Sequence, residues 1–195
     1  MWDLYSYSLM SSFFMCFFCK KSIISHCKYI TKYKNVNRME ENKIKICSYD
    51  QATKITGYSV FNNKELVTFG KLEVNEELNY IKRIKLMSEL IKQSIILHKP
   101  EIVLFEDTQY QNNVLTLKQL CQLQGSIINI LHEFELKFFI IEPTKWRSGL
   151  GIKGRKRKEQ KFNTQLKVKE LYGIEVSEDE ADAIALASFY LQREE

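Results

Sequence analysis

Proline and glycine are scarce in this sequence, whose 195 residues include two prolines and seven glycines. Low-complexity and disordered chains are usually rich in one or both residues, so the composition argues against that class. Apolar residues make up 45% of the chain, which is enough for one packed core. The length fits a single domain, and no internal repeat is evident.

Long hydrophobic runs are also missing. The apolar segment Leu9–Cys19 has 11 residues, too few to span a bilayer. Asp3 precedes this segment and a lysine pair follows it, which is not typical of a secretory signal. We therefore expect no membrane contact and no secretion, and we place the protein in the cytoplasm as a bacterial or phage-encoded product.

A zinc-binding cysteine pattern is absent as well. Cys16 and Cys19 have CxxC spacing, but no second pair follows at zinc spacing. Cys47 and Cys121 lie in apolar segments, which is typical of small buried side chains in a reduced protein. The three histidines, at positions 26, 98 and 132, lie away from every motif described below, so we expect them to be structural.

The charges are strongly segregated along the chain. Residues 1–38 hold six basic residues and one acidic residue, and the remaining residues hold 23 of each sign. Residues 143–169 contain ten basic residues and one acidic residue, whereas residues 170–182 contain six acidic residues and no basic ones. A basic segment beside an acidic cluster is typical of an enzyme that holds a polyanion and concentrates carboxylates at a metal site.

Hydrophobic periodicity predicts an α/β fold, with three antiparallel strands followed by alternating helices and strands. Such an order implies a mixed five-stranded sheet with helices on both faces. The expected strands are Lys43–Asp50, Gly57–Phe61, Glu65–Val74, Glu101–Glu106 and Lys137–Glu142. The expected helices are Glu76–His98, Asn113–Phe134, Lys158–Tyr172 and Glu178–Gln192, with a loop over Pro143–Arg157 and a capping box formed by Ser177 and Glu180.

Four acidic residues stand at places where they can converge. Asp50 and Glu106 each end an apolar strand, and Asp179 and Asp182 share one face at the start of the last helix. An acid at a helix start often only complements the helix dipole. Asp182, however, lies in an alanine-rich apolar stretch, where a charge needs a partner or a metal ion.

Carboxylates packed together repel one another, and a divalent cation removes that penalty. Oxygen-only ligands select hard ions such as Mg²⁺ or Mn²⁺. Two such ions, about 4 Å apart, can clamp the attacking and leaving oxygens during phosphodiester cleavage. The pattern therefore predicts a metal-dependent nuclease.

Three motifs in order resemble those of the RuvC-type Holliday junction resolvases, especially their short phage-like members. The first is Asp50 at the end of a strand, followed by Thr56-Gly57-Tyr58. The second is Glu106 followed by a helix, and the third is Asp-x-x-Asp-Ala-x-Ala over residues 179–185. The helix pattern consists of Asn113, Leu117, Leu120, Gln122 and Gly125.

The resemblance covers roughly residues 43–191 and implies an RNase H-like fold. It places the metal-binding, catalytic acids at Asp50, Glu106, Asp179 and Asp182, holding two Mg²⁺ ions for which Mn²⁺ can substitute. Family members are homodimers that cut two opposing strands of a four-way junction. Here the helix Asn113–Phe134 would help form the dimer interface, where Gly125 permits close approach. No small-molecule cofactor is implied.

The sequence departs from the family at two places. Cellular members commonly have Pro-Gly after the first acid, where this chain has Gln51-Ala52. Many of them also carry an aromatic wedge three residues after the second acid, where this chain has Gln109, with Tyr110 beside it. Two alternatives to a junction resolvase therefore stay open: a related nuclease acting on flaps, forks or RNA hybrids, and a non-catalytic junction-binding protein.

The basic segment Lys153–Lys161 is predicted to contact DNA phosphates, although such a segment can also be a solvated surface. By resemblance, Lys158 or Lys161 is the candidate catalytic lysine. Trp146 can be either a core anchor or a DNA contact. The predicted DNA-binding residues are Tyr110, Asn113, Lys145, Arg147, Lys153, Arg155, Lys156, Arg157, Lys158 and Lys161.

Met39 begins the sequence MEENK directly before the first predicted strand, as a normal translation start would. We therefore interpret residues 1–38 as an extension, either an over-extended translation start or a disordered tail, and residues 39–195 as the nuclease domain. We expect the natural protein to begin at Met39, as measured by intact mass. Detection of peptides from residues 1–30 in extracts of the natural cell would contradict this expectation.

Overall fold

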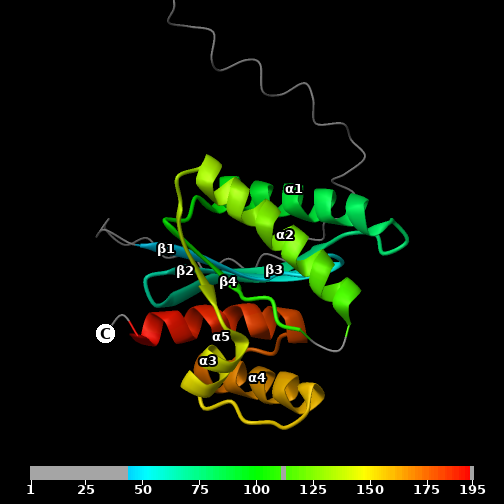
Figure 1. Ribbon diagram of the computed structural model, residues 1–195. Coiled ribbons are helices and arrows are strands. Elements are labelled where there is room, and N and C mark those ends of the chain that lie inside the picture. Colours follow the sequence, from blue (N-terminus) through cyan, green and yellow to red (C-terminus); the bar gives the residue numbers. More distant parts are fainter. Residues whose placement is uncertain (1–43, 111–112, 194–195) are drawn as a thin grey trace, which may run out of the picture.

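The computed structural model describes residues 44–110 and 113–193 (Figure 1). The predicted extension, residues 1–38, and the first residue of the predicted first strand, Lys43, lie outside the described residues. Among the described helices, none combines the length and the apolar character that crossing a membrane requires.

A five-stranded mixed sheet forms the centre of the molecule, in the order β3-β2-β1-β4-β5. β1 pairs antiparallel with β2, and β2 with β3, whereas β4 runs parallel to both β1 and β5. The predicted fold class is thereby confirmed. The strands are β1 (Lys45–Asp50), β2 (Ile55–Asn62), β3 (Glu65–Glu73), β4 (Ile102–Glu106) and β5 (Lys137–Ile141).

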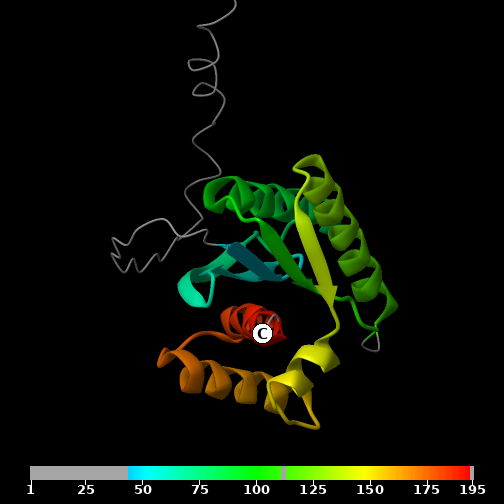
Figure 2. The same cartoon turned by 90° about the vertical axis from the view of Figure 1, so that its left-hand side faces the viewer.

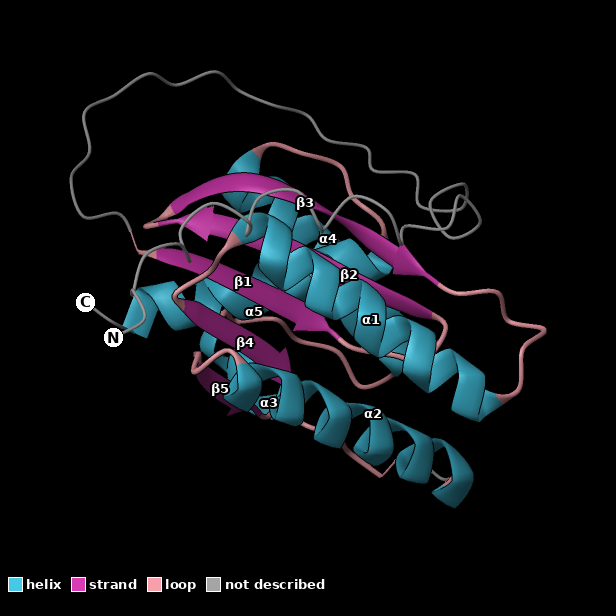
Figure 3. Cartoon of the chain, turned by 90° about the horizontal axis from the view of Figure 1, so that it is seen from above, coloured by secondary structure: helices cyan, strands magenta, loops and turns pink. Residues whose placement is uncertain are grey.

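Helices cover both faces of this sheet. Figures 1 and 2 show α1 and α2 on one face, with α5 packed on the other and α3 and α4 beyond it. Seen from above, α1 and α2 run roughly along the strands on the same face of the sheet (Figure 3). The helices are α1 (Tyr80–His98), α2 (Val114–Glu133), α3 (Pro143–Gly149), α4 (Arg157–Tyr172) and α5 (Glu178–Arg193).

Alternate side chains of the strands fill two separate cores. On β1, Cys47 and Tyr49 join the apolar residues of α1 and α2, whereas Ile46 joins those of α5 on the opposite face. β4 lies inside the sheet, and its first four residues are all buried. Continuous burial of this kind is expected of a parallel strand covered on both faces.

The predicted loop over Pro143–Arg157 is wrong in its first half, because α3 occupies Pro143–Gly149. Proline is well suited to the first helical position, since its missing N–H needs no partner there and its φ angle is already helical. Trp146 anchors the short helix with only 1% of its surface exposed. Trp146 was predicted to be either a core anchor or a DNA contact, and the structure supports the core anchor.

Two further expectations need correction. The first long helix begins at Tyr80 rather than Glu76, because the Asn79 side chain caps it by accepting a hydrogen bond from the backbone N–H of Lys82. Cys121 is exposed rather than buried, with its sulfur 3.5 Å from the Thr108 hydroxyl, whereas Cys47 is buried as predicted.

Small residues allow α5 to approach the sheet closely. The alanines at 181, 183, 185 and 187 are fully buried. The Ser48 hydroxyl donates a hydrogen bond of 2.7 Å to the carbonyl of Ala183, and the Ser59 hydroxyl lies 2.6 Å from that of Ser48. The predicted capping box is present, because the Glu180 carboxylate accepts hydrogen bonds from the backbone N–H and hydroxyl of Ser177.

Gly57 on β2 is the closest point of this approach. A Cβ atom built there would lie 1.9 Å from the carbonyl oxygen of Asp179. A side chain at position 57 would therefore push the first turn of α5 away from the sheet.

We expect Gly57→Ala to lower the free energy of unfolding by about 3 kcal/mol, because the methyl group would collide with backbone that cannot yield locally. Gly70→Ala is the matched control, since its methyl would meet only the Tyr58 side chain, at 3.0 Å. Urea unfolding followed by circular dichroism measures both variants. Equal losses of stability in the two variants would contradict the close approach of α5 at Gly57.

Candidate active site

The sheet itself brings the first two carboxylates together. β1 and β4 are parallel neighbours, and Tyr49 is paired with Phe105 in their register. Asp50 and Glu106 are the next residues of the two strands, so both strands end with an acid at the same edge of the sheet. A topological position of this kind, at the carboxyl ends of parallel strands, is where α/β proteins usually bind ligands.

The first turn of α5 supplies the other two acids. Gly57 is the strand partner of Asp50, and the backbone of Asp179 lies against Gly57, so α5 begins beside the end of β1. Asp182 lies about one turn further along and is 4% exposed. The four predicted acids therefore gather from three elements, β1, β4 and α5.

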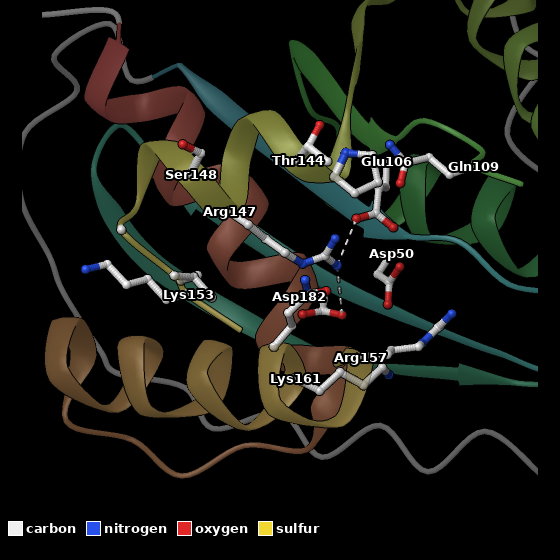
Figure 4. A pocket seen from close by; sticks show the side chains of 14 residues that line it. Asp50, Glu106, Gln109, Thr144, Arg147, Ser148, Lys153, Arg157, Lys161 and Asp182 are labelled. Atoms are coloured by element: carbon white, nitrogen blue, oxygen red, sulfur yellow. Dashed lines mark hydrogen bonds and ion pairs between the residues drawn. The ribbon is translucent and has the colours of Figure 1, made fainter. Parts of the chain in front are cut away.

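These acids line two adjoining cavities. The larger, of about 630 Å³, is lined by Asp50, Glu106 and Asp182 together with four basic residues, Arg147, Lys153, Arg157 and Lys161 (Figure 4). The smaller, of about 350 Å³, shares Asp50 and Glu106 and also reaches Asp179. The acids thus lie at the boundary of a continuous depression whose walls carry positive charge.

Arg147 and Trp146 of α3 both contact Glu106. The indole N–H of Trp146 donates a hydrogen bond of 2.9 Å to Glu106 Oε1, and the Arg147 guanidinium donates to the same oxygen at 3.2 Å. The same nitrogen of Arg147 lies 3.7 Å from Asp182 Oδ2. The guanidinium also lies over the Trp146 ring, 4.3 Å from its centre.

Lys161 of α4 contacts the acids of α5. Its Nζ atom lies 3.5 Å from Asp179 Oδ1 and 3.2 Å from Glu178 Oε2. Lys71 of β3 lies 4.0 Å from the other oxygen of Asp179. Asp179 therefore lies between two lysines. The carboxylate of the neighbouring Glu180 is instead hydrogen-bonded to Ser177 in the capping box, so Asp179 is favoured over Glu180 as the fourth acid.

The pKa values of the acids reflect their burial first and their mutual repulsion second. Burial raises the pKa of Asp50 well above its ordinary value, and the carboxylates of Glu106 and Asp182 raise it further. Burial also raises the pKa of Glu106 and of Asp182, although Arg147 opposes the rise at both. Lys161 shows the complementary effect: burial opposes it, but Asp182 and Asp179 raise its pKa.

The donor set fits a hard divalent cation. All four acids offer oxygen, and Asp182 Oδ1 is buried with no hydrogen-bond partner. Within residues 44–110 and 113–193, however, no three acidic, histidine or cysteine side chains are already arranged to hold a metal ion together. Arg147 and Lys161 pair with these acids.

The predicted DNA-binding residues fall into two groups. Lys153 and Arg157 line the larger cavity, as do Arg147 and Lys161. The others lie apart from its lining: Arg155, Lys156 and Lys158 are exposed, Tyr110 is 61% exposed, Asn113 caps α2 at the smaller cavity, and Lys145 lines a separate cavity against Phe139. Of the two candidate catalytic lysines, the structure brings Lys161 to the acids, not Lys158.

Gln51 also contacts Glu106, although the sequence marks this position only as a departure from the family pattern. Its side-chain amide donates to the carbonyl of Glu106 and accepts a hydrogen bond of 3.2 Å from the backbone N–H of the same residue. The side chain is 7% exposed. Gln51 thus continues the β1–β4 pairing beyond the last backbone contact and fixes where Glu106 leaves the sheet.

The family described as crossover junction endodeoxyribonuclease RuvC matches residues 46–189. The chain belongs to this RuvC family. Its RuvC relative from Dictyoglomus thermophilum is 25% identical over 154 residues, which cover 77% of this chain and 98% of the relative. The RuvC relative from Chloroherpeton thalassium is 24% identical over 142 residues, 71% of this chain and 76% of the relative.

Two solved structures share the fold of this RuvC-family chain. Thermus thermophilus RuvC in complex with Holliday junction substrate superposes with a TM-score of 0.63 at 14% identity, covering 77% of this chain and 96% of that one. The yeast mitochondrial Holliday junction resolvase Ydc2 superposes with a TM-score of 0.53 at 14% identity, covering 75% of this chain and 77% of that one.

We expect Gln51→Ala to slow cleavage of junction DNA about ten-fold and to raise the Mg²⁺ concentration needed for half-maximal rate, because both backbone groups of Glu106 lose a partner. The asparagine side chain of Gln51→Asn is too short to reach both backbone groups of Glu106, so this variant should show the same two effects as Gln51→Ala. Single-turnover cleavage across a Mg²⁺ series measures both effects. An unchanged Mg²⁺ dependence in both variants would show that Gln51 does not position Glu106.

Proposed function

We propose that this chain is a Holliday junction resolvase that hydrolyses phosphodiester bonds at the Asp50, Glu106, Asp179 and Asp182 site. The observation that carries the proposal is the convergence of these acids, from two strand ends and one helix, beside cavities lined with basic residues. Membership of the crossover junction endodeoxyribonuclease family supports the substrate class.

The four acids would hold two Mg²⁺ ions, for which Mn²⁺ can substitute. When bound, such ions supply positive charge at the attacking and leaving oxygens of an in-line phosphodiester displacement. The two lysines beside Asp179 and the arginine beside Glu106 support this proposal, because each pairs a positive charge with one of the acids. No other cofactor is needed for this chemistry.

The residues of the larger cavity hold the DNA backbone. Lys153, Arg157 and Lys161 place positive charge on its wall, next to the acids. Contacts of this kind bind phosphates without reading bases and make affinity strongly dependent on salt. Lys161 lines both cavities, so it is the lysine that we assign to the scissile phosphate.

We further propose that the protein acts as a homodimer, so that two sites cut two opposing strands. The outer face of α2 supports this arrangement, because it exposes Leu115 to 68% of its surface and leaves open space around Gly125. A two-fold axis along this face would bring the same surface of each copy together.

One observation favours a broader specificity as the second candidate. Gln109, at the position of the aromatic wedge, lines both cavities and is half-buried, whereas Tyr110 beside it is exposed. An enzyme without a wedge at that position would select the junction centre less strictly and would also cut flaps and forks.

The test is incubation of the purified full-length protein with labelled four-way junction, flap, duplex and RNA–DNA hybrid in Mg²⁺. We expect paired, symmetric nicks in the junction and little cutting of the other substrates. Cutting of flaps at the same rate would establish the broader candidate. Binding of the junction without any cutting would contradict the catalytic function.

Asp50→Asn and Asp182→Asn should reduce junction cutting about 100-fold or more while junction binding persists, because each removes a metal ligand and also reduces repulsion towards phosphate. Glu175→Gln is the matched control, since Glu175 is an exposed acid just before α5 that pairs with Lys169 and not with a site residue. Cleavage and gel-shift assays measure the two effects. Wild-type cutting by either aspartate variant would show that the site is assigned wrongly.

A further inference from the structure

One nitrogen atom of Arg147 bridges two acids from different parts of the fold. Its Nη2 atom lies 3.2 Å from Glu106 Oε1 at the end of β4 and 3.7 Å from Asp182 Oδ2 on α5 (Figure 4). The Arg147 side chain is 18% exposed, and that of Asp182 is 5% exposed. A guanidinium in this position does what a bound metal ion would do, because it offsets the repulsion of two partly buried carboxylates.

Trp146 holds this guanidinium in place. The Trp146 ring lies under it, with 4.3 Å between the guanidinium carbon and the ring centre, and the same indole donates to Glu106 Oε1. Trp146 is itself buried, so the stacking surface is fixed by the core. Arg147 is therefore presented to the acids by α3 and does not reach them as a free surface side chain.

The pairing is nevertheless incomplete. Arg147 Nε is buried with no hydrogen-bond partner, and so is Asp182 Oδ1. Buried polar atoms without partners cost free energy, so these contacts do not satisfy the groups that make them. A divalent cation, with more charge and more coordination positions, can satisfy the same oxygens better.

We propose that Arg147 is an internal counter-ion that occupies the place of the metal ion before loading and competes with it for Glu106 Oε1 and Asp182 Oδ2. On metal binding, the guanidinium leaves these oxygens and turns into the larger cavity. There it joins Lys153 and Arg157, which line the same wall. The proposal rests on the proposed function, since it requires metal at these acids.

This exchange reconciles two assignments of one residue. Its place among basic residues in the sequence assigns Arg147 to DNA, whereas the structure pairs it with carboxylates. With metal bound, the acids no longer need the guanidinium, and its charge becomes available to a phosphate. The positive wall of the cavity is then complete only after the metal has entered.

A purely positioning role for Arg147 makes the opposite prediction. If Arg147 served only to align Glu106 and Asp182 for the metal, its removal would disorder the acids and weaken metal binding. If Arg147 competes with the metal, its removal leaves the acids unpaired and strengthens metal binding. The sign of the change in metal affinity separates the two roles without any reference to cleavage.

The experiment titrates Mn²⁺ into the full-length protein without DNA, by isothermal titration calorimetry. We expect Arg147→Met to lower the Kd for Mn²⁺ about ten-fold, because a charge-assisted contact no longer has to be broken. The thermal midpoint of this variant should be lower than that of the wild type in EDTA and should rise further on addition of Mn²⁺. Lys153→Met is the control, since among the described residues Lys153 lines the same cavity but pairs with none of the four acids.

Equal or weaker Mn²⁺ binding by Arg147→Met overturns the proposal, as does an equal gain in Lys153→Met, which would make the effect one of overall charge. Absence of Mn²⁺ binding in the wild type and in every variant refutes the metal site, and the exchange with it. If Arg147→Met does not fold in EDTA, Arg147→Lys decides. The Arg147→Lys variant should bind Mn²⁺ more tightly than the wild type by a smaller factor, because its ammonium keeps a positive charge beside the acids but lacks the planar geometry of the guanidinium. Equal or weaker binding by this variant again overturns the proposal.

Discussion

Repulsion among carboxylates held at one edge of the sheet is the constraint on which the rest of the site depends. The register of β1 and β4 places Asp50 and Glu106 at adjacent strand ends, and α5 brings Asp182 against them. Burial raises the pKa of Asp50, and the neighbouring carboxylates raise it further, so such a group left alone would spread apart or take up protons. Arg147, Lys161 and Lys71 each lie close to one or more of these acids, and their positive charges offset the repulsion.

The backbone holds the acids in place against that force. Gly57 lets the first turn of α5 rest on β2, and the hydroxyl of Ser48 ties the sheet to the carbonyl of Ala183 further along the helix. Gln51 joins the ends of β1 and β4 through both backbone groups of Glu106. These contacts involve small or neutral side chains, so they resist the repulsion without adding charge of their own.

Local patterns were sufficient to predict the sheet, the long helices and the four acids. An apolar run that ends in an acid, or an alanine-rich helix that begins with two aspartates, is visible within a few residues of sequence. α3 was not predicted, because the burial of Trp146 that stabilises it comes from the tertiary structure and its neighbouring glycines and charges resemble a loop. The exposure of Cys121 was missed because it shares α2 with apolar neighbours that face inward.

The contacts made by Gln51 and Arg147 could not be predicted in the same way. Each reaches Glu106 across a large separation in sequence, 55 residues for Gln51 and 41 for Arg147, so no local spacing reports the contact. The family resemblance marked position 51 as unusual without saying why. The basic residues around Arg147 assigned it to DNA, and only the folded chain shows the carboxylates beside it.

Trp146 contributes both to the packing of the core and to the arrangement of the side chains at the site. The same indole that fills the core beneath α5 also donates to Glu106 and supports Arg147. The acids of α5 likewise belong to a helix whose alanines are fully buried. A chain in which this core has not formed therefore cannot bring Glu106, Arg147 and the acids of α5 together, so the arrangement of the site depends on completion of the fold.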